Sequence, residues 1–104
     1  MIRLTVSYLN QPGSHFNLDY YLTKHMPMVE EKLRPHGLLN WEVEQGADGL
    51  APGTPAKYQI QANLNFPTLE AMQAAVGAEG PALMADVPNY TDVQPEVHVY
   101  KVLR

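Results

Sequence analysis

Residues 57–66 read KYQIQANLNF, and this stretch decides the fold. Apolar and polar side chains alternate along its whole length, and the apolar set is Tyr58, Ile60, Ala62, Leu64 and Phe66. A strict period of two predicts a β-strand with one buried face. Because this is the most regular alternation in the chain, we place the other elements outward from it.

A second strand is predicted just before it, over residues 38–45, with the sequence LLNWEVEQ. Between the two strands, residues 46–55 read GADGLAPGTP, and glycine and proline are typical of turns. The pieces on either side are too small to fold alone. We therefore expect a mobile hairpin connection and not a domain linker.

A helix is predicted after the strand, with Thr68 as its N-cap. Its buried positions are expected at Leu69, Met72, Ala75 and Val76. Gly77 or Gly80 should interrupt it. Pro81 should then start a separate short turn over residues 82–85, because proline suits the first helical position.

The N-terminal third holds another strand and another helix. Residues 2–8 alternate, and residues 10–14 are turn formers. Asn17 is a good N-cap, and Phe16 and Tyr21 have the spacing of a hydrophobic staple. One stripe of the helix is apolar: Leu18, Tyr21, Leu22, His25, Met28, Val29 and Leu33. Pro35 and Gly37 should end the helix.

A fourth strand over residues 96–103 completes the order β-α-β-β-α-β within one domain, residues 1–104. This order predicts a ferredoxin-like α+β fold, with a four-stranded antiparallel sheet and both helices on one face. The other sheet face would be polar, with residues such as Thr5, Glu42 and Gln61. It is either solvated or a wet, polar dimer interface, and the pattern leaves both open.

Composition excludes several classes of function. The net charge is −4 with scattered basic residues, whereas nucleic-acid binding needs a clustered basic face. No apolar run approaches the ~20 residues of a membrane span, and the N-terminus lacks the pattern of a secretory signal. With no cysteine, disulfides and thiolate chemistry are excluded. We expect a cytoplasmic protein.

His25 is the main candidate for chemistry. It lies on the apolar stripe, one turn beyond Tyr21, so it should face the sheet. Its ordinary pKa near ~6.5 lets histidine take and give protons, and partial burial favours the neutral form of a general base. Pro27 cannot donate to the Thr23 carbonyl and should bend the helix beside His25. The alternative is a core histidine with a purely structural hydrogen bond.

Other candidates would share the site with His25. Four tyrosines either line a pocket or fill the core: Tyr8, Tyr20, Tyr21 and Tyr58. Of these, Tyr21 is the best placed to share a site with His25. Asp86 either caps a helix end, which its position favours, or orients a histidine. No histidine spacing indicates a metal site, and no phosphate loop is present. A haem held by one histidine is compatible with the fold but is not indicated.

Two segments resemble the EthD family. The first runs from Pro12-Gly13 and Phe16 through Asp19-Tyr20-Tyr21 to His25-Met26-Pro27, and the second is Phe66, residues 86–92 (DVPNYTD) and Pro95. Together they span most of the chain in order and resemble the family patterns PG-x-x-F-x-x-D-YY-x-x-x-H-x-P and ADIPNYTD-x-x-P.

The resemblance implies a dimeric α+β barrel, a homodimer in which two subunits stack their open sheet faces. It also implies a pocket between sheet and helices that binds a small molecule. The family is commonly labelled oxidoreductase, although no nicotinamide or flavin site is visible, so no cofactor is expected. His25 would be the general acid and base, with Tyr21 and Asp86 positioning an apolar or aromatic oxygenated compound. A cofactor-free isomerase or dehydratase, or a non-catalytic binding or accessory dimer, is the alternative.

Overall fold

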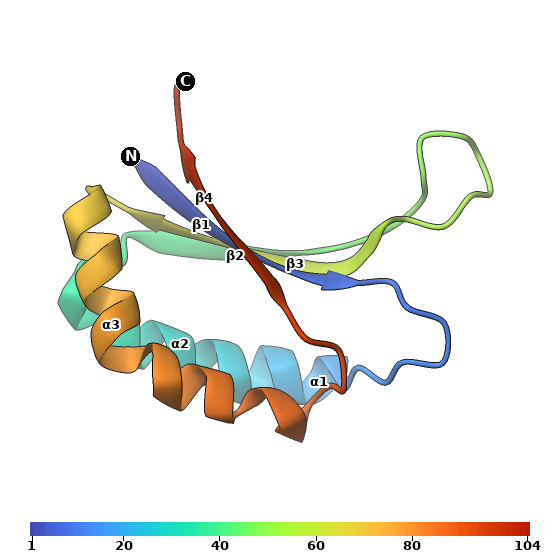
Figure 1. Cartoon of the computed structure of the whole chain (residues 1–104), viewed down its shortest axis with the longest axis horizontal. Helices are drawn as coiled ribbons and strands as arrows, with labels where there is room; N and C mark the ends of the chain where they lie inside the picture. Colours follow the sequence, from blue (N-terminus) through green and yellow to red (C-terminus); the bar gives the residue numbers. More distant parts are fainter.

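Four antiparallel strands form a single sheet in the order β2-β3-β1-β4. The computed structural model describes residues 1–104. The strands are β1 (Ile2–Leu9), β2 (Asn40–Gln45), β3 (Tyr58–Phe66) and β4 (Glu96–Lys101). With one helical region after β1 and one after β3, the predicted βαββαβ order and ferredoxin-like fold are confirmed (Figure 1). β2 begins at Asn40, two residues later than predicted, and β4 ends at Lys101, two residues earlier than predicted.

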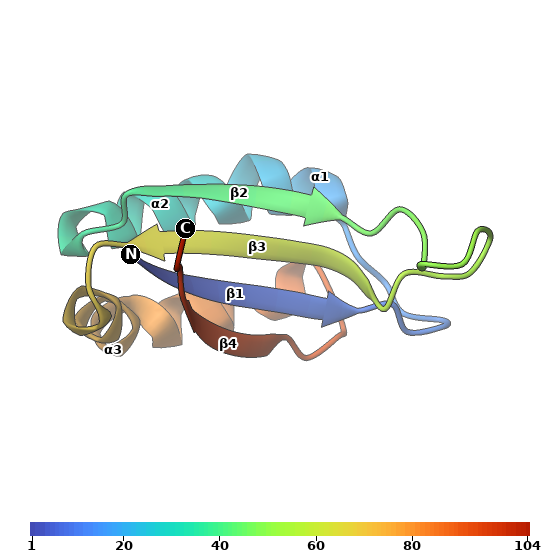
Figure 2. The ribbon, with the colours of Figure 1, turned by 90° about the horizontal axis from the view of Figure 1, so that it is seen from above.

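Both helical regions cover the same face of the sheet, and the opposite face is uncovered (Figures 1 and 2). The core lies between the two layers. It is formed by the inward residues of the central strands, including Leu4, Tyr8 and Phe66, and by helix residues such as Leu33 and Met72. The alternation of the strands therefore directs the apolar set of side chains into this core, as the sequence predicts.

The first helical region runs from Leu18 to Leu33 as α1 (Leu18–Tyr20), a π-helical segment (Tyr21–His25) and α2 (Met26–Leu33). The predicted cap is confirmed, because the Asn17 side chain accepts from the Tyr20 N–H at 3.0 Å. The predicted staple is confirmed as well, with the Phe16 and Tyr21 rings 5.2 Å apart. The region ends in a 3₁₀ turn (Arg34–His36) and at Gly37, which has a φ of 110°.

A π-helical segment directly precedes α2, which has Pro27 in its first turn. The Met26 N–H donates to the Tyr21 carbonyl, five residues back, so this turn holds one residue more than an α-helical turn. The extra residue rotates the apolar stripe. Leu22, predicted to face inward, is 43% exposed, while Met26 is buried. The prediction was wrong at Leu22 because it assumed an unbroken period of 3.6.

The second helix, α3 (Leu69–Ala85), is continuous. Its predicted cap at Thr68 is confirmed by a hydrogen bond from the Ala71 N–H at 3.1 Å. The predicted interruption at Gly77 or Gly80, and the separate turn after Pro81, are wrong. Pro81 leaves the Gly77 carbonyl without its helical partner. Both residues are exposed, so water can bond that carbonyl and the helix continues.

The buried face of α3 is narrower than predicted. Met72 and Ala75 are buried, but Leu69 and Val76 are about two-fifths exposed, at 41% and 40%. They lie at the border of the α3 face that contacts α2 and the sheet.

No helix of the chain is both long and apolar enough to cross a membrane.

The uncovered sheet face carries a network of polar side chains. Thr5 Oγ1 donates to Asn63 Oδ1 at 3.0 Å, and Ser7 Oγ donates to Gln61 Oε1 at 2.9 Å. Thr5 and Ser7 are buried by their neighbours on this face. His98 pairs with Thr5 across the β1–β4 ladder, which places it on the same face. The side chains thus satisfy one another on the uncovered face.

Candidate functional site

A cavity of about 340 Å³ lies between the sheet and the helices. β1, β3 and β4 form one wall, and α2 and α3 form the other. Most of the lining is aliphatic, for example Leu4, Val29 and Leu83. Val76 of α3 and Val97 of β4 line the cavity yet are 40% and 50% exposed, so they mark its mouth. This volume is at the lower end of the ~300–1,000 Å³ of small-molecule pockets.

His25 lines the cavity and is held by Asp86. The imidazole Nδ1 lies 2.9 Å from Asp86 Oδ2, and the histidine is 6% exposed. An ionised carboxylate can only accept hydrogen bonds. Nδ1 therefore carries the proton of the neutral ring, and Nε2 keeps its lone pair. This is the tautomer that a general base needs.

Asp86 is fixed by two further donors. The Tyr20 hydroxyl donates to Oδ1 at 2.7 Å, and the Asn89 amide donates to the same oxygen at 2.9 Å. The Asp86 side chain caps no helix end. Of the two functions predicted for Asp86, the structure shows the hydrogen bond that orients His25. Burial alone would raise the pKa of Asp86, but the hydrogen bonds from Asn89, His25 and Tyr20 outweigh it and lower that pKa.

Burial determines the charge state of His25. Desolvation lowers the pKa of the imidazole, and the nearby Asp86 carboxylate only partly compensates. The ring is therefore neutral at pH 7. Its partner, Asp86, stays ionised because the pKa of that carboxyl is lowered. The pair combines a neutral base with a carboxylate that can stabilise the imidazolium formed on proton uptake.

The π-helical segment ends at His25 and places it one turn after Tyr21. The two rings stack at 5.4 Å with an interplanar angle of 15°. Tyr21 is buried but is absent from the cavity wall. It was predicted to position a substrate. The structure instead places its ring against the imidazole, where it restricts the orientation of His25.

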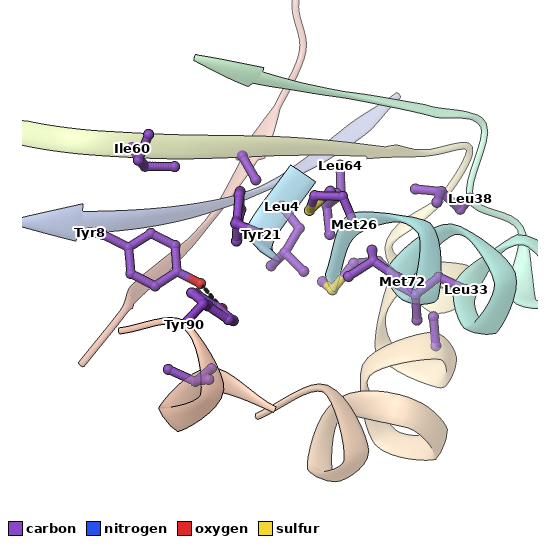
Figure 3. Packing of buried hydrophobic residues seen from close by; sticks show 14 of the residues in the cluster. Leu4, Tyr8, Tyr21, Met26, Leu33, Leu38, Ile60, Leu64, Met72 and Tyr90 are labelled. Carbon is purple, nitrogen blue, oxygen red and sulfur yellow. Dashed lines mark hydrogen bonds between the residues drawn. The ribbon is translucent and has the colours of Figure 1, made fainter. Parts of the chain in front are cut away.

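Two tyrosines on the cavity wall complete the site. The Tyr90 hydroxyl lies 3.5 Å from His25 Nε2, and it is hydrogen-bonded to the Tyr8 hydroxyl (Figure 3). Tyr8 is one of the predicted pocket or core residues, whereas Tyr90 was not singled out from the sequence. The signal that could have found it is its place in the DVPNYTD segment, four residues after Asp86. Tyr58, another pocket candidate, bonds to Glu96 instead.

No three histidine, cysteine, aspartate or glutamate side chains lie close enough together to hold a metal ion. Every buried side-chain nitrogen and oxygen has a hydrogen-bond partner. The polar groups at the cavity are thus two tyrosine hydroxyls and one imidazole, all uncharged at pH 7. They can accept a proton at Nε2 and donate hydrogen bonds to an oxygen beside it.

The fold and site define a ferredoxin-like α+β protein with a histidine–aspartate pair at a cavity between sheet and helices. Comparison with solved structures identifies its relatives. An EthD-like protein from Ralstonia eutropha JMP134 is 30% identical, with a TM-score of 0.92 over 99% of this chain and 92% of that one. The chain therefore belongs to the EthD family, which confirms the resemblance of its two sequence segments.

More distant structures share the fold. An EthD family protein from Bacillus halodurans C-125 has a TM-score of 0.67 at 19% identity, covering 99% of both chains. An antibiotic biosynthesis monooxygenase has a TM-score of 0.57 at 12% identity, covering 100% of both chains. No protein-family model and no curated protein matches the chain.

Proposed function

We propose that this EthD-family protein is an oxidoreductase-type enzyme that needs no bound cofactor and acts on a small apolar or aromatic oxygenated compound. His25 is its general acid and base. The observation that carries this proposal is the His25 imidazole at the wall of a largely apolar cavity, with Nδ1 2.9 Å from Asp86 Oδ2, an arrangement that leaves Nε2 as the basic nitrogen. Proton transfer by a positioned histidine contributes ~10²–10⁴-fold to a rate.

The reaction begins with transfer of a substrate proton to His25 Nε2. The imidazolium that forms is stabilised by Asp86 at 2.9 Å, as in other histidine–carboxylate pairs. Asp86 and the stacked ring of Tyr21 are positioning residues in this scheme, since they act through His25. Both side chains are largely buried, and a low local dielectric strengthens the attraction between the imidazolium and the carboxylate.

The electron pair left on the substrate can follow two routes. In the oxidative route, an activated CH₂ group reacts with O₂ and becomes a carbonyl, with the second oxygen atom leaving as water. In the other route, the proton on His25 goes to a different atom of the substrate, which is an isomerisation, or to a hydroxyl group that leaves as water, which is a dehydration. The structural neighbour described as an antibiotic biosynthesis monooxygenase favours the oxidative route.

We further propose that the protein is a homodimer that joins two uncovered sheet faces. The polar network of Thr5, Ser7, Gln61 and Asn63 supports this, because these side chains are already ordered and hydrogen-bonded to one another. Light scattering should give twice the chain mass of 11.6 kDa. A mass of one chain at every concentration would disprove the dimer.

The enzyme proposal is tested in two stages. A thermal-shift screen of aromatic phenols and lactones identifies compounds that bind the native state, since such ligands raise its stability. Turnover of these compounds is then compared between wild type, His25→Gln and His15→Gln. His15 is an exposed histidine that does not line the cavity, and it serves as the matched control.

We expect His25→Gln to fold and to lose turnover by about 10²–10⁴-fold, with His15→Gln unchanged. Turnover by the wild type should also fall on acidification, because protonated His25 cannot accept a proton. Its midpoint should lie below the ordinary histidine pKa, since burial lowers the pKa of His25. A folded His25→Gln variant with full turnover would refute the catalytic function of this residue.

A further inference from the structure

The polar side-chain atoms of the cavity wall gather at one place. They are His25 Nε2 and the hydroxyls of Tyr90 and Tyr8. The other lining residues are one glycine, one methionine and several leucines and valines, and none of their side chains carries nitrogen or oxygen. No lysine or arginine reaches the cavity. A bound molecule would therefore meet hydrogen-bonding groups at one end and aliphatic surface elsewhere.

Asp86 sets the direction of every hydrogen bond in this group. Because the carboxylate accepts from His25 Nδ1, Nε2 must accept as well, and its donor is the Tyr90 hydroxyl. The Tyr90 oxygen is then free to accept from Tyr8, whose hydroxyl points directly to it (Figure 3). The donors thus run from Tyr8 through Tyr90 to His25.

The hydrogen bond between Tyr90 and His25 is the weakest of these hydrogen bonds. Its length of 3.5 Å is well beyond the 2.7–2.8 Å typical of a hydroxyl donor to oxygen, and beyond the 2.9 Å between His25 and Asp86. A substrate hydroxyl beside both groups could accept from Tyr90 and donate to Nε2. It would replace one long hydrogen bond with two of ordinary length.

We propose that Tyr90 is a second catalytic residue, whose hydroxyl donates a hydrogen bond to the reacting oxygen of the substrate while His25 takes the proton. The inference rests on the proposed function of His25 and specifies its substrate. That substrate is an uncharged molecule with a phenolic hydroxyl or an enolisable carbonyl at one end and an apolar body.

Proton transfer to His25 leaves an electron pair on the substrate. With a phenol, the O–H bond breaks, the proton goes to Nε2, and the electron pair stays on the oxygen, which becomes an oxyanion. With a carbonyl compound, the broken bond is an adjacent C–H, and the pair moves to the carbonyl oxygen. In both cases the new negative charge lies next to the Tyr90 O–H, and such a donor stabilises the transition state.

Tyr90 is suited to donate rather than to ionise. Burial raises the pKa of its hydroxyl, so the group keeps its proton at physiological pH. Tyr8 is buried beside it, and burial likewise raises the pKa of that hydroxyl. Tyr8 holds Tyr90 in place by donating to its oxygen. A carboxylate or phosphate ligand would find no cation in the cavity to offset its lost hydration.

The test uses three probes of one shape: 2-naphthol, naphthalene and 2-naphthoate. Their dissociation constants are measured by fluorescence for wild type, Tyr90→Phe and Tyr58→Phe. Tyr58 is the matched control, since its hydroxyl bonds to Glu96 outside the cavity. We expect wild type to bind 2-naphthol best and 2-naphthoate worst. Tyr90→Phe should weaken 2-naphthol binding about 2- to 12-fold and leave naphthalene unchanged.

A wild type that binds neither 2-naphthol nor naphthalene, or binds both equally, overturns the inference. So does an equal loss for both probes in Tyr90→Phe, because this would mean that Tyr90 only packs against the ligand. Should Tyr90→Phe not fold, Tyr8→Phe gives the second measurement. It should reduce the preference for 2-naphthol over naphthalene, and an unchanged preference would contradict the hydrogen-bond chain.

Turnover separates this inference from the proposed function. If His25→Gln abolishes turnover and Tyr90→Phe keeps the wild-type kcat, His25 is catalytic and the inference about Tyr90 is wrong. If His25→Gln keeps turnover while Tyr90→Phe still loses the preference for 2-naphthol, the proposed function fails and Tyr90 remains a ligand-binding residue.

Discussion

Replacing Asp86 with asparagine should move the proton of the His25 ring from Nδ1 to Nε2. The asparagine side chain has nearly the same shape, with one accepting oxygen and one donating NH₂ group. Tyr20 and Asn89 both donate to Oδ1, so the amide oxygen should stay there. The NH₂ group then faces Nδ1, which must become the acceptor. Nε2 would carry the proton, and the lone pair at the cavity would be lost.

The magnitude follows from the three hydrogen bonds that Asp86 accepts. Hydrogen bonds to a charged group contribute ~1.5–3 kcal/mol each, and neutral ones ~0.5–1.5 kcal/mol. Loss of the charge therefore removes about 3–4.5 kcal/mol over three bonds. Relief of the desolvated carboxylate offsets part of this, and we expect a destabilisation of about 2–3 kcal/mol. Turnover of the proposed enzyme should fall about 10²–10⁴-fold, since the base has the wrong tautomer.

NMR of the imidazole nitrogens measures the tautomer directly and needs no substrate. At a pH where His25 is neutral, the protonated nitrogen should be Nδ1 in wild type and Nε2 in Asp86→Asn. The pKa of His25 should also fall further, because the carboxylate that raises it is gone. Asp92→Asn is the matched control, since Asp92 accepts from the His15 backbone and contacts neither His25 nor the cavity. An Asp86→Asn variant that keeps its proton on Nδ1 would refute the reasoning.

Acidification should destabilise the protein below about pH 6.5, because burial lowers the folded-state pKa of His25 and the unfolded chain therefore binds a proton first. Urea midpoints across this range measure the effect, and a midpoint that rises on acidification would contradict it. Gly77→Ala should stabilise α3 by about 1 kcal/mol, since a Cβ there meets nothing within 4 Å, whereas Gly13→Ala should destabilise because Gly13 has a φ of 79°. Thermal unfolding of both variants tests this pair, and a lower Tm for Gly77→Ala would argue against a continuous α3. Asn17→Ala should cost about 1 kcal/mol through loss of the N-cap, and an unchanged Tm would show that the cap contributes nothing.

The order of elements, the sheet and much of the core could be predicted from local patterns. A period of two in residues 57–66 indicates a strand with one buried face, and Asn17 and Thr68 mark helix starts, because caps act on backbone groups two or three residues away. Pro81 shows where local reading fails. Its ring disfavours a helix, but α3 continues, since water can bond the one carbonyl that proline leaves free.

The sequence by itself determined the fold class, the family segments and the inward position of His25, because each depends on residues within a few turns of one another. Only the tertiary structure decided the partners of that histidine. Asp86 lies 61 residues from His25, and Tyr8 lies 82 residues from Tyr90. No periodicity reports a contact over such a distance. These side chains meet because β1, the first helical region and the segment after α3 converge at one end of the cavity.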